Sequence, residues 1–258
     1  MSGCGGSGRT SSGGKTAPSL REQPAADGGV PRLELREWAE RYGLIAGITT
    51  REHGFGLGQV MTHWRAFRSG FAGRFPGVVV SHQVHGTAVS WHQRRTDGLL
   101  ILDGLDGHAT AAPGVLLTIT VADCVPVYLA APQGGAHALL HAGWRGVAAG
   151  ILERGVAALQ QYARVAPADI VVHCGVGICG ACYEVGPDVA ARFTGQPESG
   201  PRQVDLREIL IQQAQRLGIT QATRSPWCSA HDRERFFSHR ASGGRDGRMV
   251  AYLGRPAA

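Results

Sequence analysis

Three short apolar runs follow one another in the middle of the chain, and they constrain the fold more than any other feature. The runs cover residues 115–121, 125–130 and 136–141. Each has the length of a strand and is rich in Val, Ile, Leu or Ala, a pattern typical of buried strands. Only a few residues separate each run from the next, so we expect these strands to pair with one another.

Further short apolar runs predict more strands, and longer amphipathic segments predict helices. The additional strands are expected at 44–50, 78–82, 88–91, 99–102, 170–173 and 248–253. Helices are expected at 33–42, 59–71, 147–162, 187–193 and 206–217, and a loop at 103–113. Many strands with few long helices favour an α+β fold built in layers.

Composition separates a terminal segment from one large domain. Residues 1–31 are rich in Gly and Ser and poor in large apolar side chains, so we predict a disordered tail there. Residues 32–258 are expected to form a single domain. Hydrophobic residues make up 43% of the chain and charged residues 18%, which is enough to bury a substantial core.

Charge and cysteine content exclude several classes of protein. The net charge of +6 suits an anionic small substrate, while the scattered arginines argue against a nucleic-acid partner. No apolar run reaches the roughly 18 residues of a membrane helix, and no secretory signal is expected. Six cysteines are too few for a disulfide scaffold in a chain of 258 residues, so a reducing cytoplasm is expected.

Three stretches carry residues suited to binding a metal. They are Gln83-Val-His-Gly86, Ala122-Asp-Cys-Val125 and His141-Ala-Gly-Trp-Arg-Gly146. His85, Cys124 and His141 are donors that zinc accepts, and a site with three protein ligands leaves a position open for water. Their spacing matches no local zinc pattern, so each could equally be a buried core residue, with His82 and His137 as competing ligands.

A cysteine-rich loop offers an alternative function. The spacing Cys174-x4-Cys179-x2-Cys182 resembles that of a plant-type iron–sulfur loop, and Cys228 could supply the fourth thiolate. This alternative would make the protein an electron carrier. Free buried thiols on a glycine-rich turn are the ordinary explanation of the same pattern.

Four motifs together resemble a known family. Besides the first two metal motifs, they are His141-Ala-Gly-Trp-Arg-Gly146 and Cys182-Tyr-Glu-Val-Gly186. In this order they are similar to the laccase-domain family, also called the YfiH-type or multicopper polyphenol oxidoreductase family. The resemblance continues through Asp205-Leu-Arg207, Arg235-Phe-Phe-Ser-His-Arg240 and Gly247-Arg-Met249. It departs at Val121 and His239, where the family usually has Thr and Tyr.

The resemblance implies a fold, a cofactor and an activity. The fold would be α+β, a single domain of mixed sheets flanked by helices in an α/β/β/α arrangement. Zn²⁺ would be held by His85, Cys124 and His141, where copper would compete for the same ligands. The activity would be that of a purine nucleoside phosphorylase acting on adenosine, inosine or methylthioadenosine with phosphate, together with adenosine deaminase activity.

The same resemblance, combined with residue chemistry, suggests catalytic and substrate-binding groups. Arg51, Arg145 and Arg240 are candidates for phosphate, because a guanidinium matches two phosphate oxygens at once. Trp144 could stack on the purine, and Asp123 could orient a ligand or move a proton. A true copper oxidase is disfavoured, because its copper cluster requires His-x-His pairs and none of the 11 histidines forms one. A role in cell-wall precursor quality control is a further, non-phosphorylase alternative.

Overall fold

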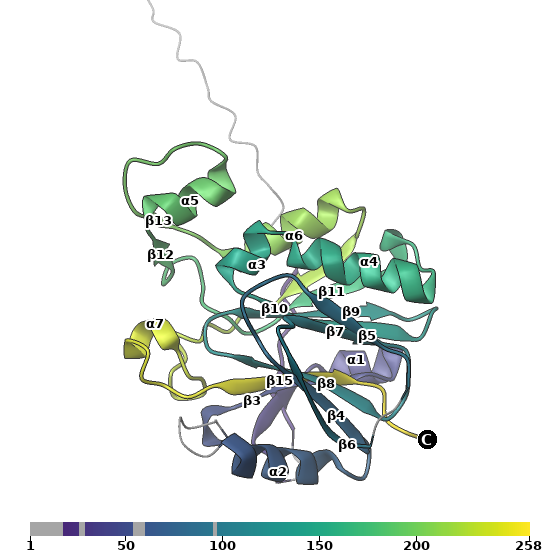
Figure 1. Cartoon of the computed structure of the whole chain (residues 1–258). Helices are drawn as coiled ribbons and strands as arrows, with labels where there is room; N and C mark the ends of the chain where they lie inside the picture. Colours follow the sequence, from purple (N-terminus) through teal and green to yellow (C-terminus); the bar gives the residue numbers. More distant parts are fainter. Residues whose placement is uncertain (1–17, 26–28, 54–59, 95–96) are drawn as a thin grey trace, which may run out of the picture.

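Two β-sheets stack face to face, and helices cover both outer faces of the stack (Figure 1). The computed structural model describes residues 18–25, 29–53, 60–94 and 97–258. The four layers follow the α/β/β/α order, so the predicted fold class is confirmed.

One sheet has seven strands and mixed direction. Its order is β1 (Gln23–Pro24), β2 (Arg32–Glu34), β3 (Ile45–Thr49), β15 (Met249–Gly254), β8 (Val115–Val121), β4 (Gly77–His82) and β6 (Gly98–Asp103). Strand β4 runs parallel to both of its neighbours, β6 and β8, whereas the other pairs are antiparallel.

The second sheet has six strands and supplies most of the site described below. Its order is β14 (Gln221–Arg224), β11 (Val171–Cys174), β9 (Val125–Ala131), β10 (Ala136–Ala142), β7 (Gly107–Thr110) and β5 (Val89–His92). A two-stranded ribbon, β12 (Glu184–Val185) and β13 (Arg202–Gln203), lies apart from both sheets (Figure 1).

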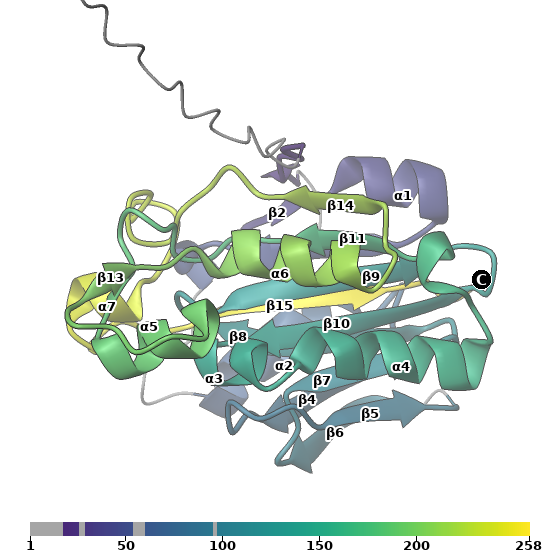
Figure 2. The ribbon, with the colours of Figure 1, turned by 90° about the horizontal axis from the view of Figure 1, so that it is seen from above.

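Helices cover the two outer faces unequally. Helix α2 (Val60–Phe71) packs on the seven-stranded sheet, while α3 (Trp144–Ala148), α4 (Ile151–Ala163) and α6 (Leu206–Arg216) pack on the six-stranded sheet (Figures 1 and 2). The remaining helical segments are α1 (Arg36–Tyr42), η1 (Arg51–His53), η2 (Pro167–Asp169), α5 (Pro187–Thr194) and α7 (His239–Ser242).

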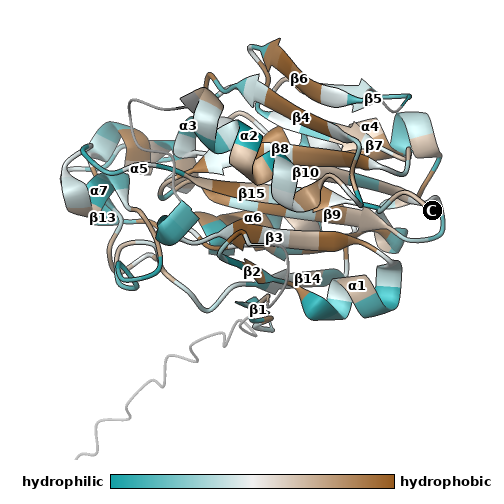
Figure 3. Ribbon diagram, turned by 90° about the horizontal axis from the view of Figure 1, so that it is seen from below, coloured by the Kyte–Doolittle hydropathy of each residue, from teal (hydrophilic) through white to brown (hydrophobic). Residues whose placement is uncertain are grey.

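The core fills the space between the layers, as strand alternation requires. Along β8, Leu117 and Ile119 point toward the second sheet and join Tyr128 and Leu139 there, whereas Leu116 faces α2. Successive side chains of a strand point to opposite faces, and both faces of β8 are covered. Figure 3 shows the resulting concentration of hydrophobic residues in strands such as β4, β8 and β15.

Three local predictions are wrong. The segment predicted as a helix at 33–42 begins with strand β2 before α1 starts. The predicted loop at 103–113 contains β7, which pairs with both β5 and β10. The predicted helix at 147–162 is two helices, α3 and α4, because Gly150 adopts a left-handed backbone conformation with φ of 87°.

Part of the N-terminal segment packs on the two sheets. Within the segment predicted to be a disordered tail, residues 18–25 pack against the domain, and Ser19 bridges to Arg224 of β14. Glu22 is buried, with 1% of its surface exposed. Residues 1–17 lie outside the described residues. Within the described part of the chain, none of the helices combines the length and apolarity needed to cross a membrane.

Candidate functional site

The structure brings together the three predicted metal ligands, which come from three different connections. His85 lies in the loop between β4 and β5, Cys124 between β8 and β9, and His141 near the end of β10. Because β9 and β10 are antiparallel with Ala142 opposite Val125, Cys124 meets the end of β10. The donor atoms of the three residues all lie within 4.8 Å of one another.

Unusual backbone conformations occur at His85 and next to Cys124, and they set the direction of these two side chains. His85 has φ of 60° and Asp123, beside Cys124, has φ of 83°. Residues other than glycine rarely adopt positive φ, and such strain persists where neighbouring contacts enforce it. At His85 the enforcing contact is a hydrogen bond from its N–H to Asp106 Oδ1, at 2.9 Å.

Asp106 contacts two of the three proposed ligands, although it does not line the pocket. Its Oδ2 accepts hydrogen bonds from the N–H groups of Val84 and Gly86, at 3.2 and 2.7 Å. Its Oδ1 lies 2.8 Å from His141 Nδ1. A carboxylate on one imidazole nitrogen fixes the ring and leaves the other nitrogen for a metal. Asp106 therefore shapes the loop of His85 and orients His141 at once.

The three donors and Asp106 shift one another's protonation. Burial alone would raise the pKa of Cys124, but hydrogen bonds with His141 and His85 lower it to about 6. Burial opposes the charged form of His141, yet its bonds to Asp106 and Cys124 raise its pKa to about 9. Burial likewise opposes ionisation of Asp106, but the bond to His141 and those from backbone amides hold its pKa below the ordinary value.

Gly143 leaves the room that the ligands need. A Cβ atom at this position would lie 2.9 Å from His85 Cδ2 and 3.1 Å from Cys124 Sγ. A Cβ at Gly146 would lie 2.9 Å from the carbonyl oxygen of Gly86. The glycines of the His-Ala-Gly-Trp-Arg-Gly motif thus allow the start of α3 to approach the loop that carries His85.

These residues fit a zinc ion. Two imidazoles and one thiol of lowered pKa converge from well-fixed positions, and zinc accepts this donor set. The described residues do not fit a multicopper cluster: their groups of three or more potential ligands are this one and a cysteine-rich one, and each contains at most two histidines.

A cavity of about 740 Å³ opens over the three ligands. This volume lies within the range typical of small-molecule sites. Its walls include Trp144, Arg145, Tyr183, Arg240 and Arg248. Three arginines at one cavity favour an anionic ligand.

The predicted arginines differ in their surroundings. Arg145 is exposed and stacks over Trp144, with its guanidinium carbon 4.3 Å from the ring centroid. Arg240 stacks over Tyr183 at 5.1 Å and donates to the carbonyl oxygen of Glu184. Arg51 does not line the cavity.

The guanidinium of Arg51 is occupied elsewhere. It donates to the carbonyl oxygen of Arg233 at 2.7 Å and pairs with Asp246 at 3.4 Å. It also stacks over the ring of Phe237 at 4.7 Å. These contacts join η1 to the segments on both sides of α7.

Asp123 lines the cavity, but both of its carboxylate oxygens have partners. Ser229 Oγ donates to Oδ1 at 2.6 Å, and the N–H of Arg240 donates to Oδ2 at 2.7 Å. Asp123 therefore joins the loop of Cys124 to the two segments that follow β14. This arrangement suits a positioning role.

Sequence reasoning missed Asp106, Tyr183 and Arg248. The Asp-Gly pair at 106–107 is typical of a turn, and no spacing rule connects it with His85 or His141. Tyr183 stands inside a motif that carries the family resemblance, and that motif was the available signal. Arg248 likewise stands inside the stretch Gly247-Arg-Met249, which also carries the resemblance.

The iron–sulfur alternative fails on Cys174. This cysteine lies in β11 with none of its surface exposed, and burial raises its pKa to about 12. It is not part of the cluster that contains Cys179, Cys182 and Cys228, in which His231 is the fourth member. The plant-type loop predicted from the spacing is therefore not formed.

Comparison with known proteins identifies close similarities. A family model described as multi-copper polyphenol oxidoreductase laccase matches residues 57–256. Purine nucleoside phosphorylase YlmD of Geobacillus stearothermophilus is 33% identical over 252 residues, which cover 90% of this chain and 92% of that protein. A purine nucleoside phosphorylase of Deinococcus radiodurans is 36% identical over 182 residues, covering 68% of this chain and 69% of the relative.

Solved structures show the same fold. The crystal structure of YlmD from Geobacillus stearothermophilus superposes with a TM-score of 0.80 at 31% identity, covering 93% of this chain and 100% of that one. The crystal structure of the Bacillus licheniformis hypothetical protein YfiH gives a TM-score of 0.78 at 26% identity, covering 88% and 97%.

Proposed function

The chain belongs to the multi-copper polyphenol oxidoreductase laccase family, and we propose that within it the chain is a zinc-dependent purine nucleoside phosphorylase. The observation that carries this proposal is the cavity in which His85, Cys124 and His141 converge beside three arginines. The names of the relatives give the reaction class. The proposed substrates are adenosine, inosine and methylthioadenosine, each with phosphate.

Phosphorolysis requires an anion site, a flat site for the base and close control of geometry. Hydrogen phosphate attacks the anomeric carbon of the nucleoside and the glycosidic bond breaks. The purine departs with the bonding electrons and gains the proton that the phosphate gives up. Arg145 and Arg240 are assigned to phosphate, because guanidinium groups pair with two of its oxygens. Arg248, which also lines the cavity, adds to the positive potential that draws the anion in.

Aromatic side chains form the proposed base site. Trp144 and Tyr183 both line the cavity, and each is already covered on one face by an arginine. Such a stacked pair is rigid, so little conformational entropy is lost when a purine packs beside it. Asp123 is assigned a positioning role, holding the Cys124 loop against the segment that begins α7.

Zinc would be held by His85, Cys124 and His141, and three protein ligands leave one coordination position open. When bound there, the ion would activate a water molecule near neutral pH, which is what hydrolytic removal of the amine of adenosine requires. We therefore include adenosine deaminase activity in the proposal. All five cysteines in the described part of the chain are free, which supports the proposed reducing, cytoplasmic location.

A product assay with and without phosphate tests this function. The purified full-length protein is incubated with adenosine, inosine or methylthioadenosine, and free base and inosine are separated and quantified. We expect free base to be released only when phosphate is present, and inosine to form from adenosine without phosphate.

Two controls make the product assay decisive. His85→Ala should abolish both activities, because it removes one of the three proposed ligands, whereas Arg51→Ala should retain them. Oxidation of a phenolic substrate without any phosphate-dependent release of base would refute the proposal and favour a polyphenol oxidase. Free base released equally with and without phosphate would indicate a hydrolase.

A further inference from the structure

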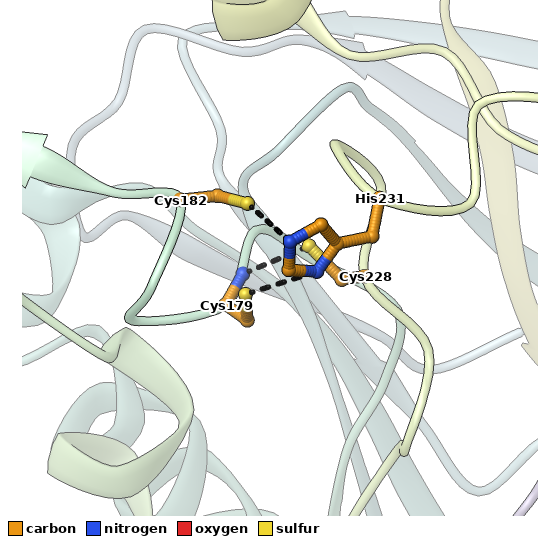
Figure 4. Close-up of side chains that lie close together, drawn as sticks. All are labelled: Cys179, Cys182, Cys228 and His231. Atoms are coloured by element: carbon orange, nitrogen blue, oxygen red, sulfur yellow. Dashed lines mark hydrogen bonds between the residues drawn. The ribbon is translucent and has the colours of Figure 1, made fainter.

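A second cluster of metal-ligating side chains lies outside the cavity. Cys179, Cys182, Cys228 and His231 place one donor atom each within 4.8 Å of all the others. None of the four lines the cavity, although Ile178 does. The cluster is drawn in Figure 4.

Two loops supply the four residues in two matching pairs. Cys179 and Cys182 follow β11 in a Cys-x2-Cys turn, and Cys228 and His231 follow β14 in a Cys-x2-His turn. Within the first turn, the N–H of Cys182 donates to the carbonyl oxygen of Cys179 at 3.0 Å. Short turns of this kind present two ligands on the same side, as structural zinc sites do.

The side chains face one another. His231 Nδ1 lies 3.6 Å from Cys179 Sγ, and Nε2 lies 3.1 Å from Cys182 Sγ (Figure 4). With a Zn–N bond of about 2.0 Å and a Zn–S bond of about 2.3 Å, a tetrahedral site places its nitrogen and sulfur atoms about 3.5 Å apart. The cluster is therefore already close to the size that a single ion requires.

The surrounding backbone is arranged as expected around thiolates. The N–H of Cys179 points at Cys228 Sγ, at a nitrogen–sulfur distance of 3.3 Å. Amide donors of this kind stabilise negative charge on metal-bound sulfur. Cys179 and Cys182 are half-buried and Cys228 is buried, so the three thiols do not share an apolar environment whose packing would bring them together.

We propose that Cys179, Cys182, Cys228 and His231 bind one zinc ion as a structural site, separate from the one in the cavity. Cys₃His is a closed ligand set that leaves no position for a substrate. Common iron–sulfur clusters are held instead by four cysteines, or by two cysteines and two histidines. This inference does not rest on the proposed phosphorylase function.

The site would fasten two walls of the cavity to each other. The loop after β11 continues to Tyr183, and the loop after β14 continues through Ser229 toward Arg240. A bridge between Gly177 and Cys228 brings the loops together, and Ser229 bonds Asp123 beside the first metal site. A bound ion would add a strong cross-link between two loops that are also joined by hydrogen bonds.

Metal analysis of the full-length protein tests the proposal. Zinc, iron and copper are quantified per chain after purification under reducing conditions. We expect about two zinc ions per chain in the unmodified protein and about one in Cys124→Ser, Cys182→Ser and His231→Ala. The double variant Cys124→Ser/Cys182→Ser should retain none. His82→Ala, which replaces another exposed histidine, should retain both ions.

Cobalt provides a test that does not depend on how well the cluster variants fold. The Cys124→Ser protein, stripped of metal and titrated with Co²⁺ alone, should bind one equivalent. It should then show the visible bands of tetrahedral cobalt and the near-ultraviolet charge-transfer bands of cobalt bound to several thiolates.

Results of three kinds would overturn the proposal. The first is a single zinc in the unmodified protein that is lost in Cys124→Ser. The second is a Cys124→Ser protein that binds no Co²⁺ with thiolate bands. The third is iron in place of zinc, or a disulfide between two of the cysteines in protein purified under reducing conditions.

Discussion

Gly143 leaves room for His85 and Cys124 to lie close to the start of α3. In Gly143→Ala the new Cβ would press on His85 and Cys124, so we expect zinc affinity at this site to fall by about 10-fold or more. Competition with a chelator of known affinity measures the change. Gly186→Ala is a matched control, because Gly186 also precedes a helix in an extended conformation but has open space around it. Equal affinities in the two variants would contradict the steric argument.

His137 makes a pH-dependent contribution to stability. It is fully buried, and burial together with Arg255 lowers its pKa to about 3. The unfolded chain, with a histidine pKa of about 6.5, binds a proton that the folded chain does not. The contribution of His137 to the free energy of unfolding is therefore complete above pH 6.5. It is lost as the pH falls below that value, by about 1.4 kcal/mol per pH unit.

Replacing His137 should remove that slope. His137→Gln is expected to lose about 1.4 kcal/mol per pH unit less than the unmodified protein between pH 6 and pH 4. Urea unfolding at several pH values measures both slopes. Above pH 7 the difference in unfolding free energy between the two proteins should become constant, because His137 then titrates in neither the folded nor the unfolded state. Parallel curves throughout the acid range would refute the assignment.

At the residue scale, the three donors that converge were predictable, and the contacts that hold them in place were not. The family resemblance named His85, Cys124 and His141, whereas their spacing alone left His82 and His137 as competitors. Asp106 escaped notice because its partners lie 20 or more residues away in sequence. Hydrogen bonds of that range leave no periodicity that a sequence pattern can detect.

Among the structural elements, the loop between β4 and β5 depends most on a single side chain. Asp106 accepts from three of its backbone amides and holds His141 as well. Asp106→Asn removes the charge and one acceptor, so we expect zinc affinity to fall about 10- to 100-fold. Asp103→Asn changes an aspartate whose side chain is 87% exposed and should leave zinc affinity unchanged. Unchanged zinc binding in both variants would show that Asp106 does not orient the ligands.

Elements with a strong apolar pattern were predictable, and those stabilised by their neighbours were not. The runs at 115–121, 125–130 and 136–141 became β8, β9 and β10. Strand β7 was missed because Gly-His-Ala-Thr has no strand-like alternation. It forms because β5 and β10 supply hydrogen-bond partners on both sides. Such tertiary support overrides local propensity.

At the scale of the whole molecule, residues 18–25 contribute a buried contact that composition did not reveal. Glu22 lies 3.1 Å from His173 Nε2 and accepts from Ser225 Oγ at 2.7 Å. Glu22→Ala leaves both partners buried without it, so the free energy of unfolding should fall by about 2 kcal/mol. Chemical denaturation measures the loss. Glu37→Ala removes an exposed glutamate and should cost far less. If Glu22→Ala lowered the free energy of unfolding by as little as Glu37→Ala, residues 18–25 would contribute little to stability.

The central claim is that one metal-dependent cavity performs phosphorolysis. Its most direct test follows the release of hypoxanthine from inosine and phosphate by one sample of protein in three states. The states are as purified, after removal of metal by a chelator, and after zinc is restored. We predict activity in the first, loss of activity in the second and recovery in the third, with Cys124→Ser inactive throughout. Undiminished phosphorolysis by metal-free protein would contradict the claim.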